Sequence, residues 1–322
     1  MKRVIIDTDA GVDDALALIF ALRSPELFVE AITTVSGNVH VDLCTQNVLR
    51  VLDILRLPSP PPVARGEEKP LSRTLFTAPE VHGEDGLGGV HSIRNNLGDL
   101  KYPEPPLEAT EISAPELIAD KVAKYDGEIS IVTLGPLTNI ARAINHKPAT
   151  MRSLKEIICM AGAFRTYGNT TPVAEFNAYV DPEALEIVLD SGIPVTFVPL
   201  DVTEGVCLTE DCVAREISPL GTKLSEFVVD LVQGYMKYHK ETTGVPGCFL
   251  HDPLAVGVSI DESVVELVEG YVQVETAGKI TRGMTVCDLR SVPCVKRAPN
   301  ARICTEVDSE RFLRLFLSRI RG

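Results

Sequence analysis

The 322-residue sequence predicts an α/β fold: a single domain, residues 1–322, with a mainly parallel, Rossmann-like open sheet flanked by helices. Strand-like and helix-like segments alternate from the first residues on, and polar side chains recur just after the strand-like segments. Such alternation is typical of parallel sheets with helices on both faces. After residue 264 short β segments replace the alternation, which predicts a small β extension near the C-terminus.

The individual elements follow from apolar periodicity and from helix-start signals. Ser113 and Glu116 have the spacing of a capping box, and Pro182 after Asp181 is typical of a capped helix with proline at its first position. The predicted strands are residues 4–6, 28–34, 129–134, 156–160 and 195–198, and the predicted helices are residues 13–22, 41–55, 113–125, 222–239 and 309–320, with a further helix starting at 181.

Composition excludes several classes of function. The formal charge is −14 and no basic run exceeds two residues, which argues against a nucleic-acid partner. No apolar stretch approaches the roughly 18 residues of a membrane span. Lys2 and Arg3 lead at once into a strand, so we expect no signal peptide and a cytoplasmic location. The eight cysteines include no CxxC pair, and we expect reduced thiols rather than disulfides or a zinc site.

Four carboxylates follow one another closely at the end of the first predicted strand: Asp7, Asp9, Asp13 and Asp14. Asp7 and Asp9 are expected on one face of the strand, about 6–7 Å apart, and the other two in the first turn of the next helix. Each like-charged pair costs about 1 kcal/mol in water and several times more near a protein surface. A hard cation, calcium or magnesium, would relieve this repulsion. The alternative is one helix cap with three solvated side chains.

The string DTDAGVDDALAL resembles the N-terminal fingerprint of the inosine–uridine-preferring nucleoside hydrolase family. Each further match is short, but together they cover nearly the whole chain in the family's order, which is highly specific. The matching strings are Ser36-Gly37-Asn38, His82-Gly83-Glu84-Asp85-Gly86, Leu134-Gly135-Pro136-Leu137-Thr138-Asn139, Ala174-Glu175-Phe176-Asn177, His251-Asp252-Pro253 and Thr281-Arg282-Gly283-Met284.

The resemblance implies a calcium ion held by Asp9, Asp14, Asp252 and the backbone carbonyl of Leu134. This set of ligands leaves open positions on the ion for water and for the hydroxyls of a ribonucleoside. Asp13 is expected to bind the ribose diol. These ligands come from three distant segments, so half of the chain cannot form the site.

The implied reaction is hydrolysis of an N-glycosidic bond, which passes through an oxocarbenium-like transition state. We expect a calcium-bound water, Asp9 as the general base and His251 as the acid that protonates the leaving base. The His251-Asp252-Pro253 string also has a plain structural interpretation, a helix start with Asp252 as the N-cap, and the two can coexist.

Several further residues resemble the substrate-binding set of the family. Sugar contacts are implied for Asn169, Glu175 and Asn177, whose alternative is a loop built on Asx turns. Asn38 is either a substrate contact or an asparagine in a left-handed turn. Met160 lies against the sugar or fills the core.

The nucleobase is expected near His82 and near one helix that carries Tyr235, Tyr238 and His239. The alternatives are a surface histidine and a partly buried helix face. The family also implies a homodimer or homotetramer.

Two other functions remain open on the sequence alone. A haloacid-dehalogenase-like phosphatase also has an Asp-x-Asp strand end, but it needs a later lysine and an acidic pair, and the region of Asp201 offers no convincing counterpart. A non-catalytic calcium-stabilised nucleoside binder would need Asp14 and Asp252 but neither Asp9 nor His251.

Overall fold

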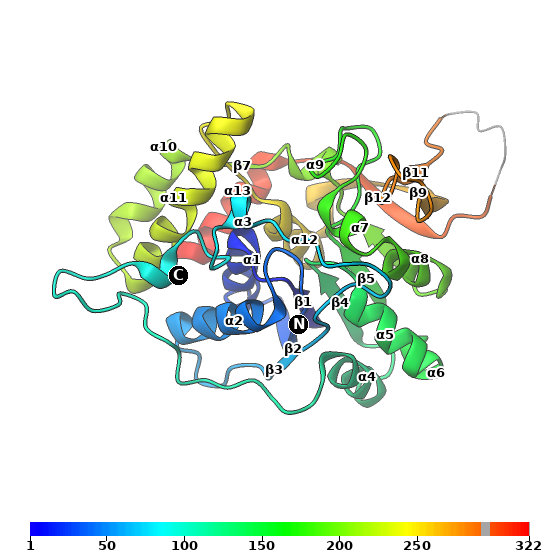
Figure 1. Ribbon diagram of the computed structural model, residues 1–322, viewed down its shortest axis with the longest axis horizontal. Helices are drawn as coiled ribbons and strands as arrows, with labels where there is room; N and C mark the ends of the chain where they lie inside the picture. Colours follow the sequence, from blue (N-terminus) through cyan, green and yellow to red (C-terminus); the bar gives the residue numbers. More distant parts are fainter. Residues whose placement is uncertain (291–296, 322) are drawn as a thin grey trace.

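The computed structural model describes residues 1–290 and 297–321. Its central sheet has eight strands in the order β3-β2-β1-β4-β5-β6-β12-β9 (Figure 1). Neighbouring strands pair in parallel, except β12 and β9, which are antiparallel. The strands of this sheet are β1 (Lys2–Thr8), β2 (Leu27–Thr34), β3 (Val63–Arg65), β4 (Ile129–Thr133), β5 (Glu156–Cys159), β6 (Val195–Phe197), β9 (Val265–Gly270) and β12 (Ala301–Val307). The predicted mainly parallel sheet is confirmed.

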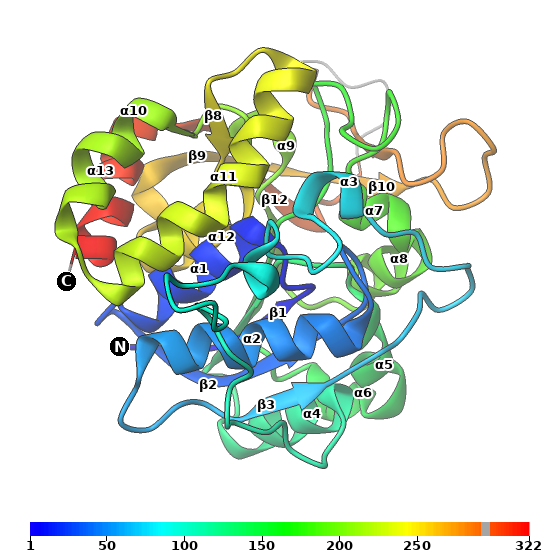
Figure 2. The ribbon, with the colours of Figure 1, turned by 60° about the vertical axis from the view of Figure 1, so that its left-hand side comes forward.

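Helices cover both faces of the sheet, and each face has its own apolar core (Figures 1 and 2). Val4 and Ile6 of β1 belong to one core and Ile5 to the other, as the period-two geometry of a strand requires. The first core is packed by α1 (Val12–Leu22), α2 (Val41–Leu55), α11 (Lys223–Thr243), α12 (His251–Ile260) and α13 (Ser309–Arg321), and the second by α4 (Ala114–Lys124), α5 (Thr138–His146) and α8 (Pro182–Asp190).

The remaining elements are short. The helices are α3 (Pro79–His82), α6 (Pro148–Met151), α7 (Phe176–Val180), α9 (Leu200–Thr203) and α10 (Glu210–Cys212), and two small sheets pair β7 (Cys207–Thr209) with β8 (Gly247–Phe249) and β10 (Val272–Val274) with β11 (Thr285–Cys287). Of the β segments after residue 264, β9 and β12 extend the main sheet, and β10 and β11 form the small extension.

The predicted helix starts are confirmed at two positions and wrong at a third. Ser113 and Glu116 form their capping box, and the Asp181 carboxylate accepts the Ala184 amide at 3.1 Å. Asp252 does not cap α12, because the helix begins at His251 and its N-cap is Leu250, two residues before the predicted cap. Its carboxylate instead turns toward other acidic groups, as described below.

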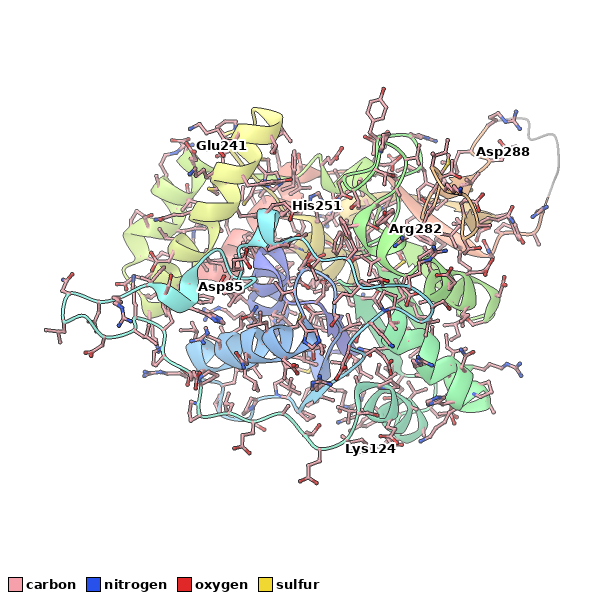
Figure 3. The ribbon with its side chains drawn as sticks, in the orientation of Figure 1. Asp85, Lys124, Glu241, His251, Arg282 and Asp288 are labelled. Atoms are coloured by element: carbon pink, nitrogen blue, oxygen red, sulfur yellow. The ribbon has the colours of Figure 1, made fainter. Side chains whose placement is uncertain are left out.

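The parallel strands carry their following loops to one edge of the sheet, where open α/β sheets bind ligands. Asp9 follows β1, Leu134 follows β4 and Met160 follows β5. His251 lies toward the middle of the molecule, whereas Lys124 and Asp288 lie at its periphery (Figure 3). In the described part of the chain, no helix combines the length and apolar character that crossing a membrane requires.

Candidate active site

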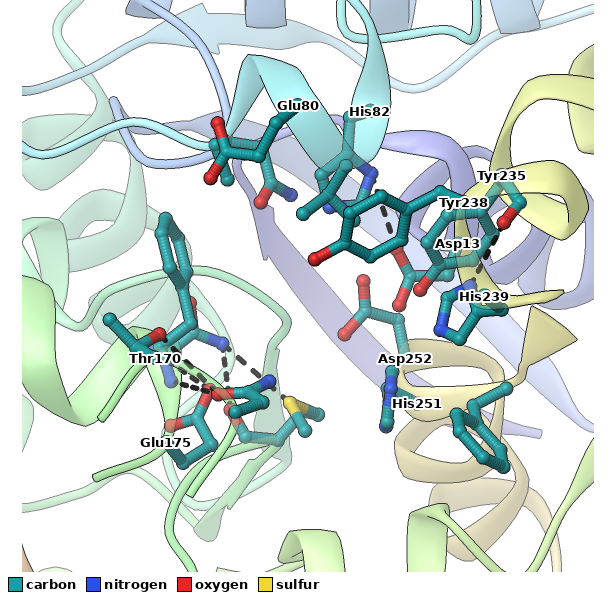
Figure 4. Close-up of a pocket in the computed structure, with 18 of the residues that line it drawn as sticks. Asp13, Glu80, His82, Thr170, Glu175, Tyr235, Tyr238, His239, His251 and Asp252 are labelled. Carbon is teal, nitrogen blue, oxygen red and sulfur yellow. Dashed lines mark hydrogen bonds and ion pairs between the residues drawn. The ribbon is translucent and has the colours of Figure 1, made fainter. Parts of the chain in front are cut away.

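A cavity of about 420 Å³ opens at this edge of the sheet (Figure 4). Its size is that of a small-molecule site. Its wall contains ten of the residues singled out from the sequence as substrate or catalytic groups, together with Leu134, Asp252 and Tyr238. These ten are Asp13, Asn38, His82, Met160, Asn169, Glu175, Asn177, Tyr235, His239 and His251.

A cluster of buried carboxylates lies beside the cavity. Asp13, Asp14 and Asp252 each offer an oxygen, and these three oxygens lie within 4.8 Å of one another. Asp13 and Asp14 stand in the first turn of α1, and Asp252 in the first turn of α12. Contacts between α1 and α12 therefore bring together residues almost 240 positions apart in the chain.

Asp9 lies next to this cluster and interacts electrostatically with Asp14 and Asp13. It is buried and, like Asp14, is not among the described residues that line the cavity. Its Oδ2 accepts the Asn38 amide at 2.8 Å, but its Oδ1 is buried and has no partner among the described residues. Two glycines make room for the Asp9 carboxylate. A Cβ on Gly37 would lie 2.0 Å from Oδ2, and a Cβ on Gly135 would lie 2.9 Å from Oδ1. The close approach of Asp9 thus explains why two of the matching strings contain glycine. The unpartnered Oδ1 of Asp9 is a candidate ligand for a cation.

Burial and mutual repulsion raise the pKa of these carboxyls. The pKa of Asp13 rises to about 8, through burial first and the charge of Asp14 second. The same two causes raise the pKa of Asp9 well above its usual range. The pKa of Asp252 is also raised, by burial and then by Asp13, Asp14 and Asp9. Ionised together without a cation, these groups oppose folding.

The donor set fits a hard divalent ion. The three oxygens that lie together all belong to carboxylates, and Asp9, whose buried Oδ1 has no partner among the described residues, interacts electrostatically with Asp14 and Asp13. Leu134 lines the cavity, and its carbonyl accepts the Asn177 side-chain amide at 2.6 Å, which leaves its second lone pair available.

Asp7 does not take part in this cluster, contrary to the expectation that it shares a face with Asp9. Its Oδ1 accepts hydrogen bonds from Thr33 and from Asn139, the latter at 2.7 Å, and burial raises its pKa to about 7. Strand β1 ends at Thr8, so Asp9 lies beyond the regular strand and its alternation.

Asn38 binds the cluster directly. Besides its backbone bond to Asp9, its side-chain amide donates to Asp14 Oδ2 at 3.1 Å. Its alternative interpretation as a left-handed turn residue is wrong, because the described non-glycine residues with positive φ are Ala10 and Arg56. Asn38 therefore orders two carboxylates at the cavity wall.

Three histidines surround the cavity. Nδ1 of His251 lies 2.7 Å from the Thr203 hydroxyl, and Nδ1 of His82 accepts the Val12 amide at 3.1 Å. Nδ1 of His239 donates to the Tyr235 carbonyl at 2.9 Å, and Figure 4 shows its ring at the cavity wall. Burial lowers the pKa of His251 to about 3 and that of His82 to about 4, so both rings are neutral near pH 7.

The residues expected around the sugar are held in place by backbone groups. The buried Glu175 carboxylate accepts three amides and caps α7, and the Asn177 side chain donates to the carbonyls of Leu134 and Met160. Asn169 Oδ1 accepts the Phe176 amide at 2.9 Å. Glu175, Asn177 and Asn169 therefore both hydrogen-bond within their loop and line the cavity, so the two interpretations coexist.

Sequence reasoning missed several wall residues. The cavity is also lined by residues that lie outside all the matching strings: Phe76, Glu80, Glu204 and Phe249. Thr203, which supports His251, is 48 residues away in sequence, so no local signal could have indicated it. Among the described residues that line the cavity, none is Lys or Arg.

Comparison with known proteins agrees with this site. The family model described as inosine-uridine preferring nucleoside hydrolase matches residues 4–314. The pyrimidine-specific ribonucleoside hydrolase RihA of Salmonella gallinarum is 41% identical over 318 residues, 98% of this chain and 97% of the relative. The structure also resembles a purine-preferring ribonucleoside hydrolase from Gardnerella vaginalis (TM-score 0.90, 34% identity, covering 100% of this chain and 98% of that one). A plant nucleoside hydrolase gives a TM-score of 0.89 at 34% identity, with 100% and 99% covered.

The chain belongs to the inosine–uridine-preferring nucleoside hydrolase family. It is an N-ribosyl hydrolase, with the family's fold and an aspartate cluster at the expected edge of the sheet. The resemblance seen in the sequence is confirmed, and membership overturns the phosphatase and non-catalytic alternatives.

Proposed function

We propose that this protein hydrolyses the N-glycosidic bond of ribonucleosides with calcium as its ion, Asp9 as the general base and His251 as the leaving-group acid. The observation that carries the proposal is the orphan Asp9 Oδ1 beside the carboxylates of Asp14 and Asp252 at a nucleoside-sized cavity. Asp9, Asp14, Asp252 and the Leu134 carbonyl would hold the ion. When bound, calcium supplies positive charge that lowers the pKa of neighbouring water and attracts the ribose hydroxyls.

Asp9 can accept a proton at its free Oδ1 while Asn38 fixes the other oxygen. A base must be held rigidly within hydrogen-bond reach of its proton, and the glycines around Asp9 permit such packing. Asp13, which lines the cavity, binds the ribose diol, and Glu175, Asn177 and Asn169 hold the remaining sugar hydroxyls. Directional carboxylate and amide groups of this kind suit a polyhydroxylated ligand.

On the other side of the cleaved bond, the departing base gains negative charge. His251 is neutral in the free protein, and an approaching negative charge favours its protonated form. Thr203 holds Nδ1, so the other ring nitrogen is left for the base. His82, Tyr235, Tyr238 and His239 surround the base with ring faces and polar edges.

The substrates we propose are nucleosides rather than nucleotides, because the cavity wall offers carboxylates and no cationic side chain among its described residues for a phosphate. Pyrimidine ribonucleosides are the preferred class, since the pyrimidine-specific relative is 41% identical and the purine-preferring one 34%. The assembly is a homodimer or homotetramer, which light scattering tests.

The direct experiment incubates the calcium-loaded protein with uridine, cytidine, inosine, 2′-deoxyuridine and uridine 5′-monophosphate, and measures released reducing sugar. We expect ribose from uridine and cytidine before inosine, and none from the monophosphate. Equal rates with and without chelator would contradict the role of calcium, and faster inosine cleavage would contradict the pyrimidine preference.

A further inference from the structure

One buried amide joins two segments that each contribute a residue to the cavity wall, Asp13 from one and His82 from the other. Asn47, in α2, is completely buried. Its Nδ2 donates to the Ala10 carbonyl at 3.0 Å and to the Asp85 carbonyl at 2.9 Å. Ala10 directly follows Asp9 in the acidic segment, and Asp85 belongs to the glycine-rich loop that follows His82. Both hydrogens of the amide are therefore used, one on each segment.

The acidic segment needs this support. Ala10 has φ +43°, a left-handed conformation that costs an alanine roughly 1–2 kcal/mol. This turn separates Asp9 from the helix that carries Asp13 and Asp14, so it sets how the carboxylates face one another. The bond from Asn47 holds the Ala10 carbonyl in the direction that the turn gives it.

The glycine-rich loop is organised around Asp85. Its carboxylate accepts the backbone amides of Leu87 and Gly89 and, through the other oxygen, that of His91, each at 2.9 Å. Gly86, at φ +75°, backs onto Asn47 so closely that a Cβ would lie 2.9 Å from Nδ2. Hydrogen bonds to Asp85 thus order the loop, and Asn47 contacts it at the Asp85 carbonyl and beside Gly86.

The same loop returns to the acidic segment through His82, whose Nδ1 accepts the Val12 amide at the start of α1. The two segments are thus linked twice, once through the hydrogen bonds of Asn47 to Ala10 and Asp85 and once through the bond between His82 and Val12. Because His82 accepts at Nδ1, its ring proton sits on Nε2, which makes that nitrogen a donor. The Oδ1 of Asn47 lies 2.9 Å from His91 Nε2, and this oxygen can only accept, so His91 donates.

We propose that Asn47 is a positioning residue that couples the ion-binding carboxylates to His82. Asn47 is not among the described residues that line the cavity, so it acts through the segments that it holds. Through its two bonds, the geometry of the cluster and the placement of His82 depend on one amide, so losing it weakens ion binding and substrate binding together. The identities of the ion and of the substrate rest on the proposed function, whereas the coupling between the two segments rests on the contacts of Asn47.

The test compares Asn47→Ala with a matched control, Thr45→Val, on the same helix. Thr45 is also buried, and its hydroxyl bonds to Thr34 and to its own helix, away from both segments. Calcium affinity is measured by calorimetry, kcat and KM on uridine, and thermal stability by circular dichroism. We expect Asn47→Ala to raise both the calcium Kd and the KM about tenfold, with a smaller change in kcat at saturation, while Thr45→Val leaves both constants unchanged.

His91→Ala provides a second, milder variant in case Asn47→Ala does not fold. His91 is half-buried and only supports the amide, so a shift of about threefold in both constants is expected. His82→Ala removes the bond to the Val12 amide at the start of α1, so it should raise the calcium Kd as well as the KM.

The coupling is refuted if Asn47→Ala or His91→Ala binds calcium and uridine like the wild type, or if Thr45→Val shows the same losses. A wild-type protein that releases no ribose overturns the proposed function instead. The calcium Kd of the same variants still tests the coupling in that case, so the two failures are distinguishable.

Discussion

Calcium should stabilise this protein more at pH 8 than at pH 5. Without an ion, burial and neighbouring charges raise the pKa of Asp13 to about 8, and raise the pKa of Asp9 and Asp252 as well. A carboxyl with a raised pKa binds its proton more tightly folded than unfolded. Its favourable contribution is complete below about pH 3.8, the unfolded value, and is lost as the pH rises through the folded pKa.

The size of the effect follows from Asp13 alone. Relative to acid pH, its raised pKa lowers the stability of the metal-free fold at pH 7 by on the order of 4 kcal/mol, taking about 1.36 kcal/mol per pH unit above the unfolded pKa. For a chain of this length the unfolding entropy is about 0.7 kcal/mol per kelvin, so the cost corresponds to a melting temperature roughly 6 °C lower. A bound cation favours the ionised forms and removes this cost.

The assay is thermal unfolding in chelator and in excess calcium at several pH values between 4 and 8. We expect the melting temperature in chelator to fall with pH relative to that in calcium, and Asp13→Asn to reduce the difference. Asp190→Asn, on the exposed end of α8, serves as the matched control. A calcium-induced shift that is equal at pH 5 and pH 8 would refute the reasoning.

Three further predictions concern activity. Asp9→Asn should lower kcat by about 10²–10⁴-fold while the circular dichroism spectrum is unchanged, and near-normal turnover would show that Asp9 is not the base. His251→Ala should slow uridine cleavage far more than cleavage of 4-nitrophenyl riboside, whose leaving group needs no proton; equal losses on both argue against an acid. Gly11→Ala places a Cβ 2.5 Å from Asn38 Nδ2 and 2.6 Å from His82 Nδ1, so kcat/KM should drop about a hundredfold, and an unchanged value would mean that neither side chain is critical.

The elements of the fold could be predicted because their signals are local. Apolar runs bounded by caps gave the strands and helices to within a few residues, as at α2, where the predicted range 41–55 is the observed one. The pairing of β9 with β12 could not be foreseen, because it joins segments whose partner choice depends on the whole sheet. The start of α12 was misplaced because Asp252 has a second use, in the carboxylate cluster.

The site was predicted where short strings carry it, and missed where single side chains from remote loops complete it. Asp13 and Asp14 lie together as the charge argument required, and Asp252 joins them from the string that carried the resemblance, but the charge argument wrongly grouped Asp7 with Asp9. A strand pattern cannot show that β1 ends at Thr8 or that Asn139, over 130 residues away, donates to Asp7 Oδ1. Asn47 was overlooked for the same reason, since an asparagine inside a helix gives no local signal.

The most direct test of the account is a high-resolution structure of the protein grown with calcium. We predict one ion within about 2.3–2.6 Å of oxygens from Asp9, Asp14 and Asp252 and of the Leu134 carbonyl, with Asp13 turned toward the ribose site. An ion bound elsewhere, or these carboxylates left without one at saturating calcium, contradicts the central claim.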